Sequence, residues 1–411
     1  MSLHLTVHRG TRQIGGSCIE IVHPDGTRLI LDAGRPLDAP EGATGLLPVS
    51  LDLSQPATVL ISHPHQDHYG LLHELPADWP VWTGAASARL IAITSEIGHA
   101  PLSRPLRTWS SRPGPIRLGP FTVTPLLTDH SAFDAYMLLV EGADRRVLYT
   151  GDFRRHGRKG RLVDALMKRP PRNVDVLVCE GTNLGTDKPV MSEHVLEDDF
   201  VKLFERTAGR VFASWSGQNV DRTVTLYNAA KRTGRTLVLD LYTADVLDRI
   251  TEGTRVPRAG FPNLKVVITA GLRGWYAKQG REDFIVRMAR HGVSAHDVPD
   301  DAVVMLRRSL MHDYEKAGLA PTKADAFNYS MWRGYLAAPY HAEPLLWCKS
   351  AGAEIAYLHS SGHAAPEDLR AFAAAIAAKA VVPVHGENWD MQTSGFGPVQ
   401  RLDDAEIWTL P

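Results

Sequence analysis

The sequence predicts an α/β protein in which a host domain of stacked sheets, flanked by helices, carries a second α/β domain inserted into it. Short strand-like runs separated by Gly, Pro and Asp fill residues 1–150, and strand and helix patterns alternate from about residue 187. After Ala351 the chain returns to strand, loop, helix and strand. Such alternation is typical of a parallel sheet with crossover helices. We therefore expect a host domain at 1–186 and 351–411 and an inserted domain at 187–350.

The expected host strands are short runs separated by Gly, Pro and Asp. Helices are expected at 66–75, 86–97 and 366–379. Strands are expected at 3–8, 17–22, 27–32, 57–61, 121–127, 136–140, 146–149 and 380–384.

Three strand-then-helix pairs define the inserted domain. They are expected at 210–213 with 219–232, at 236–241 with 244–250, and at 264–268 with 282–291. The inserted domain is therefore expected to be a sub-fold of a different kind from the host.

The composition is that of an ordinary globular protein without a strong global charge. Lys plus Arg number 45 against 46 for Asp plus Glu, so a polyanion would have to be bound by a local patch. The three cysteines are isolated, which suits a reducing compartment and excludes a cysteine zinc site. The N-terminus has no apolar core of a signal peptide, and no segment is apolar enough for a membrane span. We expect a cytoplasmic protein.

Residues 62–70, SHPHQDHYG, place four metal-capable side chains within six positions directly after an apolar strand. They are His63, His65, Asp67 and His68. The linked backbone cannot wrap all four side chains around one ion, whereas two ions could share them. Three further candidates follow strands as well: His130 in LLTDHS, Asp152 in LYTGDF and His385 in VVPVHGE. A rigid sheet can aim side chains on its strand-end loops at a common point.

In this order the motifs HxHxDH, His, Asp and His resemble the metallo-β-lactamase superfamily, which implies its αββα sandwich and two metal ions. The resemblance implies that His63, His65 and His130 hold one ion, that Asp67, His68 and His385 hold the other, and that Asp152 bridges them. Imidazole and carboxylate ligands suit Zn²⁺, with Mn²⁺ as the alternative. The segments GTRQIGGSC (10–18) and LILDAG (29–34) resemble the opening hairpin of that family. There Asp32 either supports a ligand or forms a turn before Gly34.

The inserted domain resembles that of the β-CASP branch of this superfamily, which consists of nucleases. Glu180 in VCEGTNLG, His363 in SSGHAAPE and the segment FASWSGQNVDRT (212–223) match marks of that branch. The resemblance implies a hydroxide between the metals that attacks phosphorus, and protonation of the leaving 3′-oxygen by His363. Asp67, Glu180 and His363 are the candidate catalytic residues. The inserted domain of nucleases in this branch carries a further stretch that neither MLRRSLMHDYEKAG nor FNYSMWRGYL clearly matches.

Phosphate could be bound at three places. Ser360 and Ser361 offer hydroxyls beside His363, and Arg154 and Arg155 lie just after Asp152 in the chain. Ser216 and Asn219 lie where a helix is expected to begin, and helix N-termini attract phosphate oxygens. The alternatives are a solvated turn for the arginines and ordinary helix caps for Ser216 and Asn219.

The leading hypothesis is a dinuclear zinc phosphodiesterase that acts on RNA or another single-stranded nucleic acid. A small phosphodiester or nucleotide-like metabolite is the alternative substrate, and a closed pocket rather than a basic groove would favour it. A non-catalytic scaffold is a third hypothesis. It predicts missing ligands, yet all seven ligand positions are filled.

Overall fold

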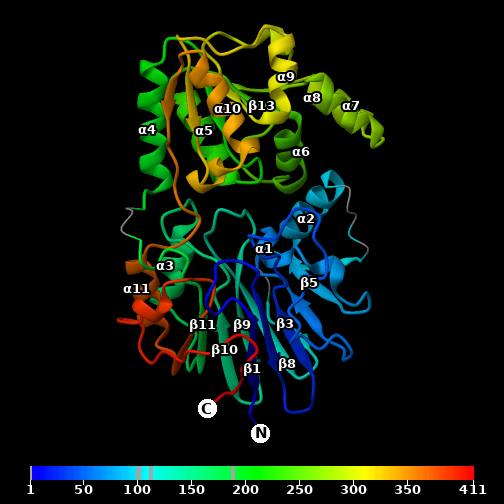
Figure 1. The fold of residues 1–411 in the computed structure, drawn as a ribbon, viewed down its shortest axis with the longest axis vertical. Coiled ribbons are helices and arrows are strands. Elements are labelled where there is room, and N and C mark those ends of the chain that lie inside the picture. Colours follow the sequence, from blue (N-terminus) through cyan, green and yellow to red (C-terminus); the bar gives the residue numbers. More distant parts are fainter. Residues whose placement is uncertain (1, 99–101, 103, 111–113, 187–189) are drawn as a thin grey trace. The chain divides into compact units, whose positions relative to one another are not determined.

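The chain forms two compact units in a computed structural model that describes residues 2–98, 102, 104–110, 114–186 and 190–411. Unit 1 comprises Met1–Val190 and Gly362–Pro411, and unit 2 comprises Met191–Ser361 (Figure 1). The expected start of the insertion, residue 187, lies outside the described residues. Unit 2 ends at Ser361 rather than at residue 350, because strand β18 (Glu354–Ala356) pairs in parallel with β17 (Ala326–Tyr329).

Unit 1 contains two sheets, with the strand orders β20-β1-β2-β3-β4-β5-β6 and β19-β11-β10-β9-β8-β7. The strands of the first sheet are β1 (His4–Arg9), β2 (Cys18–Val22), β3 (Arg28–Leu31), β4 (Thr58–Leu60), β5 (Val81–Gly84), β6 (Leu106–Trp109) and β20 (Ile407–Thr409). Those of the second sheet are β7 (Ile116–Leu118), β8 (Phe121–Leu127), β9 (Tyr136–Gly142), β10 (Arg145–Tyr149), β11 (Val176–Cys179) and β19 (Ala380–Pro383).

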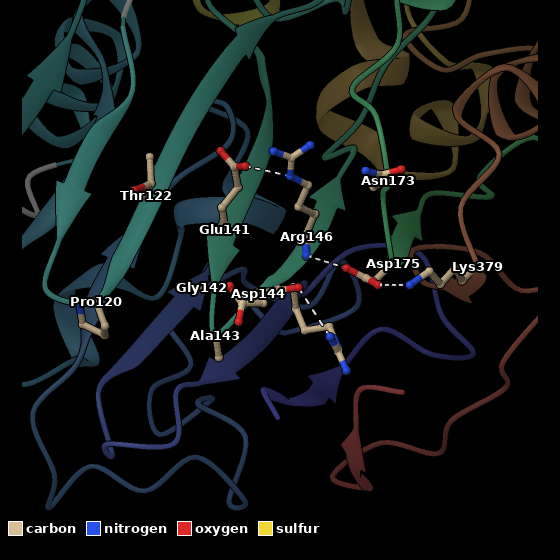
Figure 2. Close-up of a pocket in the computed structure, with 11 residues that line it drawn as sticks. Pro120, Thr122, Glu141, Gly142, Ala143, Asp144, Arg146, Asn173, Asp175 and Lys379 are labelled. Atoms are coloured by element: carbon tan, nitrogen blue, oxygen red, sulfur yellow. Dashed lines mark hydrogen bonds and ion pairs between the residues drawn. The ribbon is translucent and has the colours of Figure 1, made fainter. Parts of the chain in front are cut away.

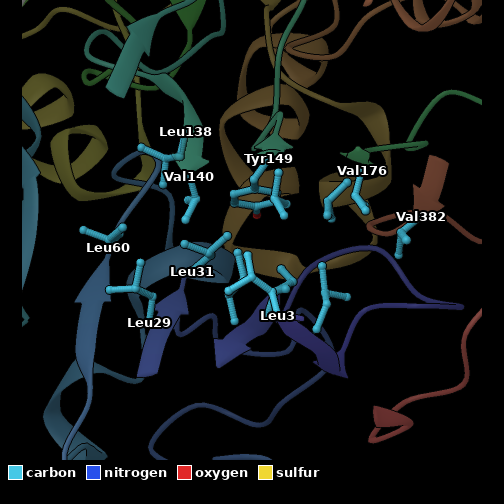
Figure 3. Packing of buried hydrophobic residues seen from close by; sticks show 14 of the residues in the cluster. Leu3, Leu29, Leu31, Leu60, Leu138, Val140, Tyr149, Val176 and Val382 are labelled. Atoms are coloured by element: carbon cyan, nitrogen blue, oxygen red, sulfur yellow. The ribbon is translucent and has the colours of Figure 1, made fainter. Parts of the chain in front are cut away.

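The inner faces of the two sheets share one apolar core, which Figure 3 shows. Leu29 and Leu31 of β3 point into this core, together with Leu138 and Val140 of β9. The residue between the first two, Ile30, belongs to a separate apolar cluster on the outer face of its sheet. Side chains on a strand alternate between its two faces, so apolar residues at successive positions bury both faces of each sheet.

Helices cover both outer faces of the sandwich. On one side α2 (Ala85–Ile97) contributes Ile91 to the cluster that contains Ile30. On the other side α3 (Gly160–Lys168) and α11 (Pro366–Ile376) contribute Val163 and Phe372 to a cluster with the outward side chains of β9. The resulting order of layers is helix, sheet, sheet, helix, and the predicted αββα fold class is confirmed.

The helix expected at 66–75 is wrong in its length. The structure has a single turn, α1 (Gln66–Tyr69), followed by a 3₁₀ turn, η1 (Leu72–Glu74). The helix stops because the backbone N–H of Leu71 donates to the carbonyl of Ala33, at 2.9 Å, instead of continuing the helical ladder. No described helix is both long and apolar enough to cross a membrane.

Unit 2 is built on one seven-stranded sheet in which every described strand pair is parallel, in the order β15-β14-β13-β16-β12-β17-β18. Its remaining strands are β12 (Val211–Ser214), β13 (Leu237–Asp240), β14 (Leu264–Val267), β15 (Gly292–Val293) and β16 (Val303–Met305). Its helices are α4 (Glu193–Arg206), α5 (Val220–Arg232), α6 (Leu241–Ile250), α7 (Ala270–Lys278), α8 (Glu282–Ala289), α9 (Arg308–Lys316) and α10 (Pro339–Ser350), with 3₁₀ turns η2 (Ala295–Asp297) and η3 (Arg333–Ala337). Unit 2 is therefore an α/β sub-fold, as the sequence predicts.

Replacing Leu138 by Ala tests the shared core of unit 1. Its side chain is fully buried between the two sheets, so Leu138→Ala is expected to lower the free energy of unfolding by about 2–5 kcal/mol. Ile407→Ala, a control at a side chain that is 72% exposed, should change it by less than about 0.5 kcal/mol. Denaturant titration followed by circular dichroism measures both, and equal effects would contradict the proposed core.

Candidate metal centre

The candidate ligands of unit 1 gather because the strands that precede them end at one edge of the sandwich. In the second sheet β10, β11 and β19 run parallel, and they are followed by Asp152, Glu180 and His385. β8 has the same direction as β10, because both pair antiparallel with β9, and it is followed by His130. In the first sheet β3 and β4 are parallel and are followed by Asp32 and by residues 62–68.

Three histidines form the first group of potential ligand atoms: His63, His65 and His130. Nδ1 of His65 lies 3.2 Å from Nε2 of His63 and 3.1 Å from Nε2 of His130. The other ring nitrogen of His130 contacts the carbonyl oxygen of Gly362 at 2.6 Å. That contact fixes Nδ1 as the donor and leaves the Nε2 lone pair pointing at the group.

The second group contains Asp67, His68, Asp152 and His385, whose ligand atoms lie within 4.8 Å of one another. Nε2 of His68 is 3.1 Å from Oδ2 of Asp152, and Nε2 of His385 is 3.2 Å from Oδ2 of Asp67. Nδ1 of His385 lies 2.9 Å from the hydroxyl of Thr182, so its Nε2 faces the group. Asp152 also lies 3.6 Å from His63 and 4.0 Å from His130 of the first group.

Asp32 supports the second group instead of forming a simple turn. Its side chain is fully buried and lies 2.7 Å from Nδ1 of His68. The same carboxylate accepts hydrogen bonds of 2.7 Å from the hydroxyls of Ser62 and Tyr149. Asp32 has a φ of 63°, a conformation that Asp tolerates better than most residues. The carboxylate therefore orients His68 with Nε2 toward Asp152.

Gly34 lets the opening hairpin lie directly against the metal-binding loop. A Cβ atom at this position would be 1.8 Å from the backbone oxygen of Asp67. The same oxygen accepts a 3.1 Å hydrogen bond from the N–H of Ser17. The segments 10–18 and 29–34 thus hold the backbone that carries Asp67 and His68.

Beside these groups, the buried side chain of Glu180 pairs with His363, which is 21% exposed. Nδ1 of His363 lies 3.1 Å from Oε2 of Glu180 and 3.8 Å from Asp152. Glu180 is 1% exposed and also accepts hydrogen bonds from the backbone N–H groups of Phe153 and Thr182. Burial alone lowers the pKa of His363, but the charges of Glu180 and Asp152 outweigh it and raise the pKa to about 9.

The charge states of His63 and His130 suit cation binding. Burial and the neighbouring imidazoles hold the pKa of His63 and of His130 well below that of an ordinary histidine. Neutral imidazole is the form that binds a metal. Burial would raise the pKa of Asp152, but the charges of His385, His68 and His363 outweigh it and keep the carboxylate ionised.

The donor set fits divalent cations. Imidazole nitrogens and carboxylate oxygens are ligands of zinc and manganese. Oδ1 of Asp152 is buried and has no hydrogen-bond partner among the described residues, although an unpaired buried carboxylate oxygen costs free energy. An ion held by Asp152 would satisfy that oxygen.

The predicted phosphate-binding residues are engaged elsewhere. The side chain of Arg154 is fully buried and pairs with Asp129 at 3.4 Å, so it is not presented to a substrate. Arg155 is 40% exposed and pairs with Asp164 at 2.6 Å and with Asp368 at 3.1 Å. Neither placement supports phosphate binding by these arginines.

The serines and Asn219 are likewise used locally, within unit 2. Asn219 is the N-cap of α5, where its side chain accepts from the N–H of Arg222 at 3.0 Å, and Ser216 accepts from the N–H of Gln218 at 3.3 Å. For Asn219 this is the helix-cap alternative, whereas the hydrogen bond of Ser216 lies in the turn before α5. The hydroxyl of Ser360 donates to the carbonyl of Met191, and Ser361 is half-buried.

A polar hollow in unit 1 is a separate feature (Figure 2). It lies near the amino ends of β8, β10, β11 and β19, whereas the candidate ligands follow the carboxyl ends of these strands. It is lined by the amino end of β10 and the residues before β11. Arg146 pairs with Glu141 at 2.8 Å, and Lys379 pairs with Asp175 at 2.7 Å. These pairs leave the lining with matched charges. Among the described residues, none of the clusters of potential metal ligands lies in the hollow, so it does not compete as the reactive site.

Sequence reasoning missed the hydroxyl and amide groups that orient the ligands. Ser62 and Tyr149 bond to Asp32, Thr182 contacts His385, and the side chain of Asn183 donates to the carbonyl of His363 at 2.9 Å. Ser62, Thr182 and Asn183 each lie within three residues of a candidate ligand or catalytic residue. That closeness in the chain was the available signal.

Comparisons with known proteins agree with this geometry. Residues 12–187 match the family model described as the metallo-beta-lactamase superfamily. Residues 352–393 match the model described as the Zn-dependent metallo-hydrolase RNA specificity domain.

Curated relatives are named Ribonuclease J. That of Helicobacter pylori (strain B128) is 25% identical over 419 residues, which cover 94% of this chain and 56% of the relative. That of Mycobacterium tuberculosis (strain ATCC 25618 / H37Rv) is 25% identical over 421 residues, covering 95% and 69%. The relative from Sinorhizobium meliloti is 27% identical over 187 residues, covering 44% and 33%. The chain spans about half the length of the curated relatives it matches.

The fold is also found in a solved structure. A crystal structure of a protein of unknown function from Enterococcus faecalis V583 has a TM-score of 0.81 and 19% sequence identity, with 100% of each chain covered. The two proteins share a fold.

Replacing Asp32 by Asn tests its support of His68. The change removes the negative charge that orients Nδ1–H of His68, and we expect about 10–100-fold weaker binding of one of two metal equivalents. Titration against a chelator measures this affinity. Asp134→Asn is the matched control, because Asp134 is also buried and also accepts from a tyrosine, at 2.7 Å, but lies outside both ligand groups. Equal metal affinity of the Asp32 and Asp134 variants would contradict the supporting role.

Proposed function

Because the chain belongs to the metallo-β-lactamase superfamily, we propose that it is a metal-dependent phosphodiesterase that cleaves RNA or another single-stranded nucleic acid. One observation carries the proposal: Asp152 belongs to one group of metal-ligand atoms and lies 3.6 Å from His63 of the other, and the Glu180–His363 pair lies beside it. This arrangement supports the proposed ligands: His63, His65 and His130 for one ion, Asp67, His68 and His385 for the second, and Asp152 for both. Zn²⁺ is the proposed metal, with Mn²⁺ as the alternative.

Two divalent cations would supply an activated water and neutralise the charge that builds on the phosphoryl oxygens. The residues around them hold that chemistry in place. Asp32 and Thr182 fix the ring orientations of His68 and His385, and the carbonyl of Gly362 fixes that of His130. Such outer contacts keep each imidazole in the tautomer that can bind a metal.

His363 is proposed as the general acid. The departing ribose 3′-oxygen is a poor leaving group and needs a proton as its bond to phosphorus breaks. Glu180 holds Nδ1 of His363 and favours its charged form, which leaves Nε2–H to deliver the proton. A cation bound to Asp152 would offset part of the rise in pKa, since it competes for the same carboxylate.

RNA is favoured as the substrate by the second family match. Residues 352–393, which contain His363 and His385, match a model described by its RNA specificity, and the relatives are named Ribonuclease J. A small phosphodiester is the second candidate substrate. It is favoured by the near-equal counts of acidic and basic residues and by the engagement of Arg154 and Arg155 in ion pairs. A non-catalytic scaffold is disfavoured because all the ligand groups converge.

The metal content of the purified protein tests the dinuclear proposal. Under metal-replete conditions we expect close to two equivalents per chain, because each ligand group has enough donors for one ion when Asp152 is shared. Elemental analysis after gel filtration measures this. One equivalent or less would contradict the dinuclear centre, and prolonged chelation should abolish cleavage of labelled RNA.

His363→Ala separates acid catalysis from metal binding. The variant should keep its metal and lose roughly 10²–10⁴-fold in the rate of RNA cleavage, the usual contribution of a general acid. When sulfur replaces the bridging 3′-oxygen of the substrate, the leaving thiolate departs without protonation. The variant should therefore recover most of the lost rate on this sulfur substrate.

The control is His73→Ala, at a histidine of unit 1 whose side chain is 50% exposed, and it should leave both rates unchanged. If His363→Ala slows the oxygen and sulfur substrates equally, His363 binds or positions the substrate and is not the acid.

Glu180→Gln should change the pH profile of cleavage. An acid must be protonated to act, so the rate falls as the pH rises through the pKa of His363. Loss of the Glu180 charge lowers that pKa, and the alkaline limb should move to lower pH. The sulfur substrate should show no such shift. An alkaline limb that stays in place on the oxygen substrate would contradict the pairing.

A further inference from the structure

A row of exposed aromatic rings lies at the carboxyl edge of the parallel sheet in unit 2. It follows β17 and runs through η3 to the start of α10, the region labelled α10 in Figure 1. Trp332, Tyr335 and Tyr340 are 59%, 47% and 49% exposed. The segment lies partly in FNYSMWRGYL, which the nuclease resemblance does not account for. Ligands of open parallel sheets bind beyond the carboxyl ends of the strands.

The rings support one another and form a continuous surface, called here the ring row: Trp332, Tyr335, Tyr340 and His341. The ring centroids of Trp332 and Tyr335 are 5.3 Å apart and meet edge to face. Tyr335 lies 5.5 Å from His341, and His341 lies 5.4 Å from Tyr340. These separations are within the range of favourable aromatic contact. The rings are thus held by neighbours and still present surface to the solvent.

Two arginines accompany the rings. The guanidinium of Arg308 lies over Tyr340 at 5.6 Å, and that of Arg333 lies over the ring of Tyr357 at 3.9 Å. Arg308 pairs with Glu343 at 2.5 Å. Arg333 is exposed and has no carboxylate partner in the part of the chain that the structure describes. A cation beside open rings is complementary to the bases and phosphates of one nucleic-acid strand.

We propose that the ring row is a stacking platform for bases of single-stranded RNA, with Arg333 contacting a phosphate. The proposal rests on the function proposed above. A group of exposed large aromatic side chains marks an interaction surface, because an aromatic ring contributes most to the free energy of binding when a partner covers it. A phosphate also supplies the negative partner that Arg333 lacks, which favours RNA over an apolar protein partner.

The test compares the affinity of a labelled oligoadenylate for the metal-loaded protein and its variants, under conditions where a gel shows no cleavage product. Combined Trp332→Ala and Tyr335→Ala should weaken binding by roughly tenfold or more, while Trp332→Phe should retain most of it. The matched control is Val286→Ala on α8, which also removes an apolar side chain of unit 2 that is 57% exposed. It should leave the affinity unchanged.

Two further arms identify the chemistry. An oligonucleotide with abasic sites should bind the wild type more weakly and should erase the difference between the wild type and the double variant, because no base is left to stack. Arg333→Ala should instead weaken every sequence alike and reduce the slope of log K against log salt by about one.

The outcomes are distinguishable from those of the proposed function. Hydrolysis of bis(p-nitrophenyl) phosphate needs no strand, so the double variant should keep the wild-type rate. An inactive wild type that still binds RNA through the rings would contradict the proposed function and leave the platform standing. Unchanged RNA affinity in the double variant, or an equal loss on the abasic strand, would overturn the platform. The platform would also be overturned if the wild type sedimented as a dimer and the double variant as a monomer, with unchanged RNA affinity. That result would make the ring row a protein interface.

Discussion

The carboxylate of Asp152 is the centre on which the rest of the candidate site depends. It is buried and lies within 4.0 Å of five histidines, with Oδ2 at 3.1 Å from His68 and Oδ1 at 3.7 Å from His385. A charged group in such a place costs free energy unless its surroundings compensate. The neighbouring imidazoles provide part of the compensation, and Oδ1 has no hydrogen-bond partner among the residues that the structure describes. Bound cations would complete it.

That constraint explains the architecture around the site. Asp152 can meet ligands from both sheets only because the carboxyl ends of β4, β8, β10, β11 and β19 lie at one edge of the sandwich. The apolar core between the sheets holds those ends in register, and rigid strands position ligands better than mobile loops. Asp32 illustrates the coupling, since its one carboxylate contacts Ser62, His68 of α1 and Tyr149 at the end of β10.

Much of this could be predicted from the sequence, because strand-end ligands have short-range signals. HxHxDH follows an apolar run, and His130, Asp152 and His385 each follow another, so the ligand groups and the two α/β sub-folds were both predictable. The failures have a common physical reason. The end of α1 depends on a hydrogen bond from Leu71 to Ala33, and the burial of Arg154 depends on Asp129; neither contact between separate segments is visible in local pattern.

The most direct test of the account is the metal content of Asp152→Asn compared with that of His385→Ala. If Asp152 serves both ions, Asp152→Asn should lower occupancy at both sites, whereas His385→Ala should lose one equivalent and keep the first group filled. Elemental analysis and chelator titration on both variants measure this. Retention of one tightly bound equivalent by Asp152→Asn, with the same affinity as in the wild type, would contradict a shared carboxylate at the centre of the site.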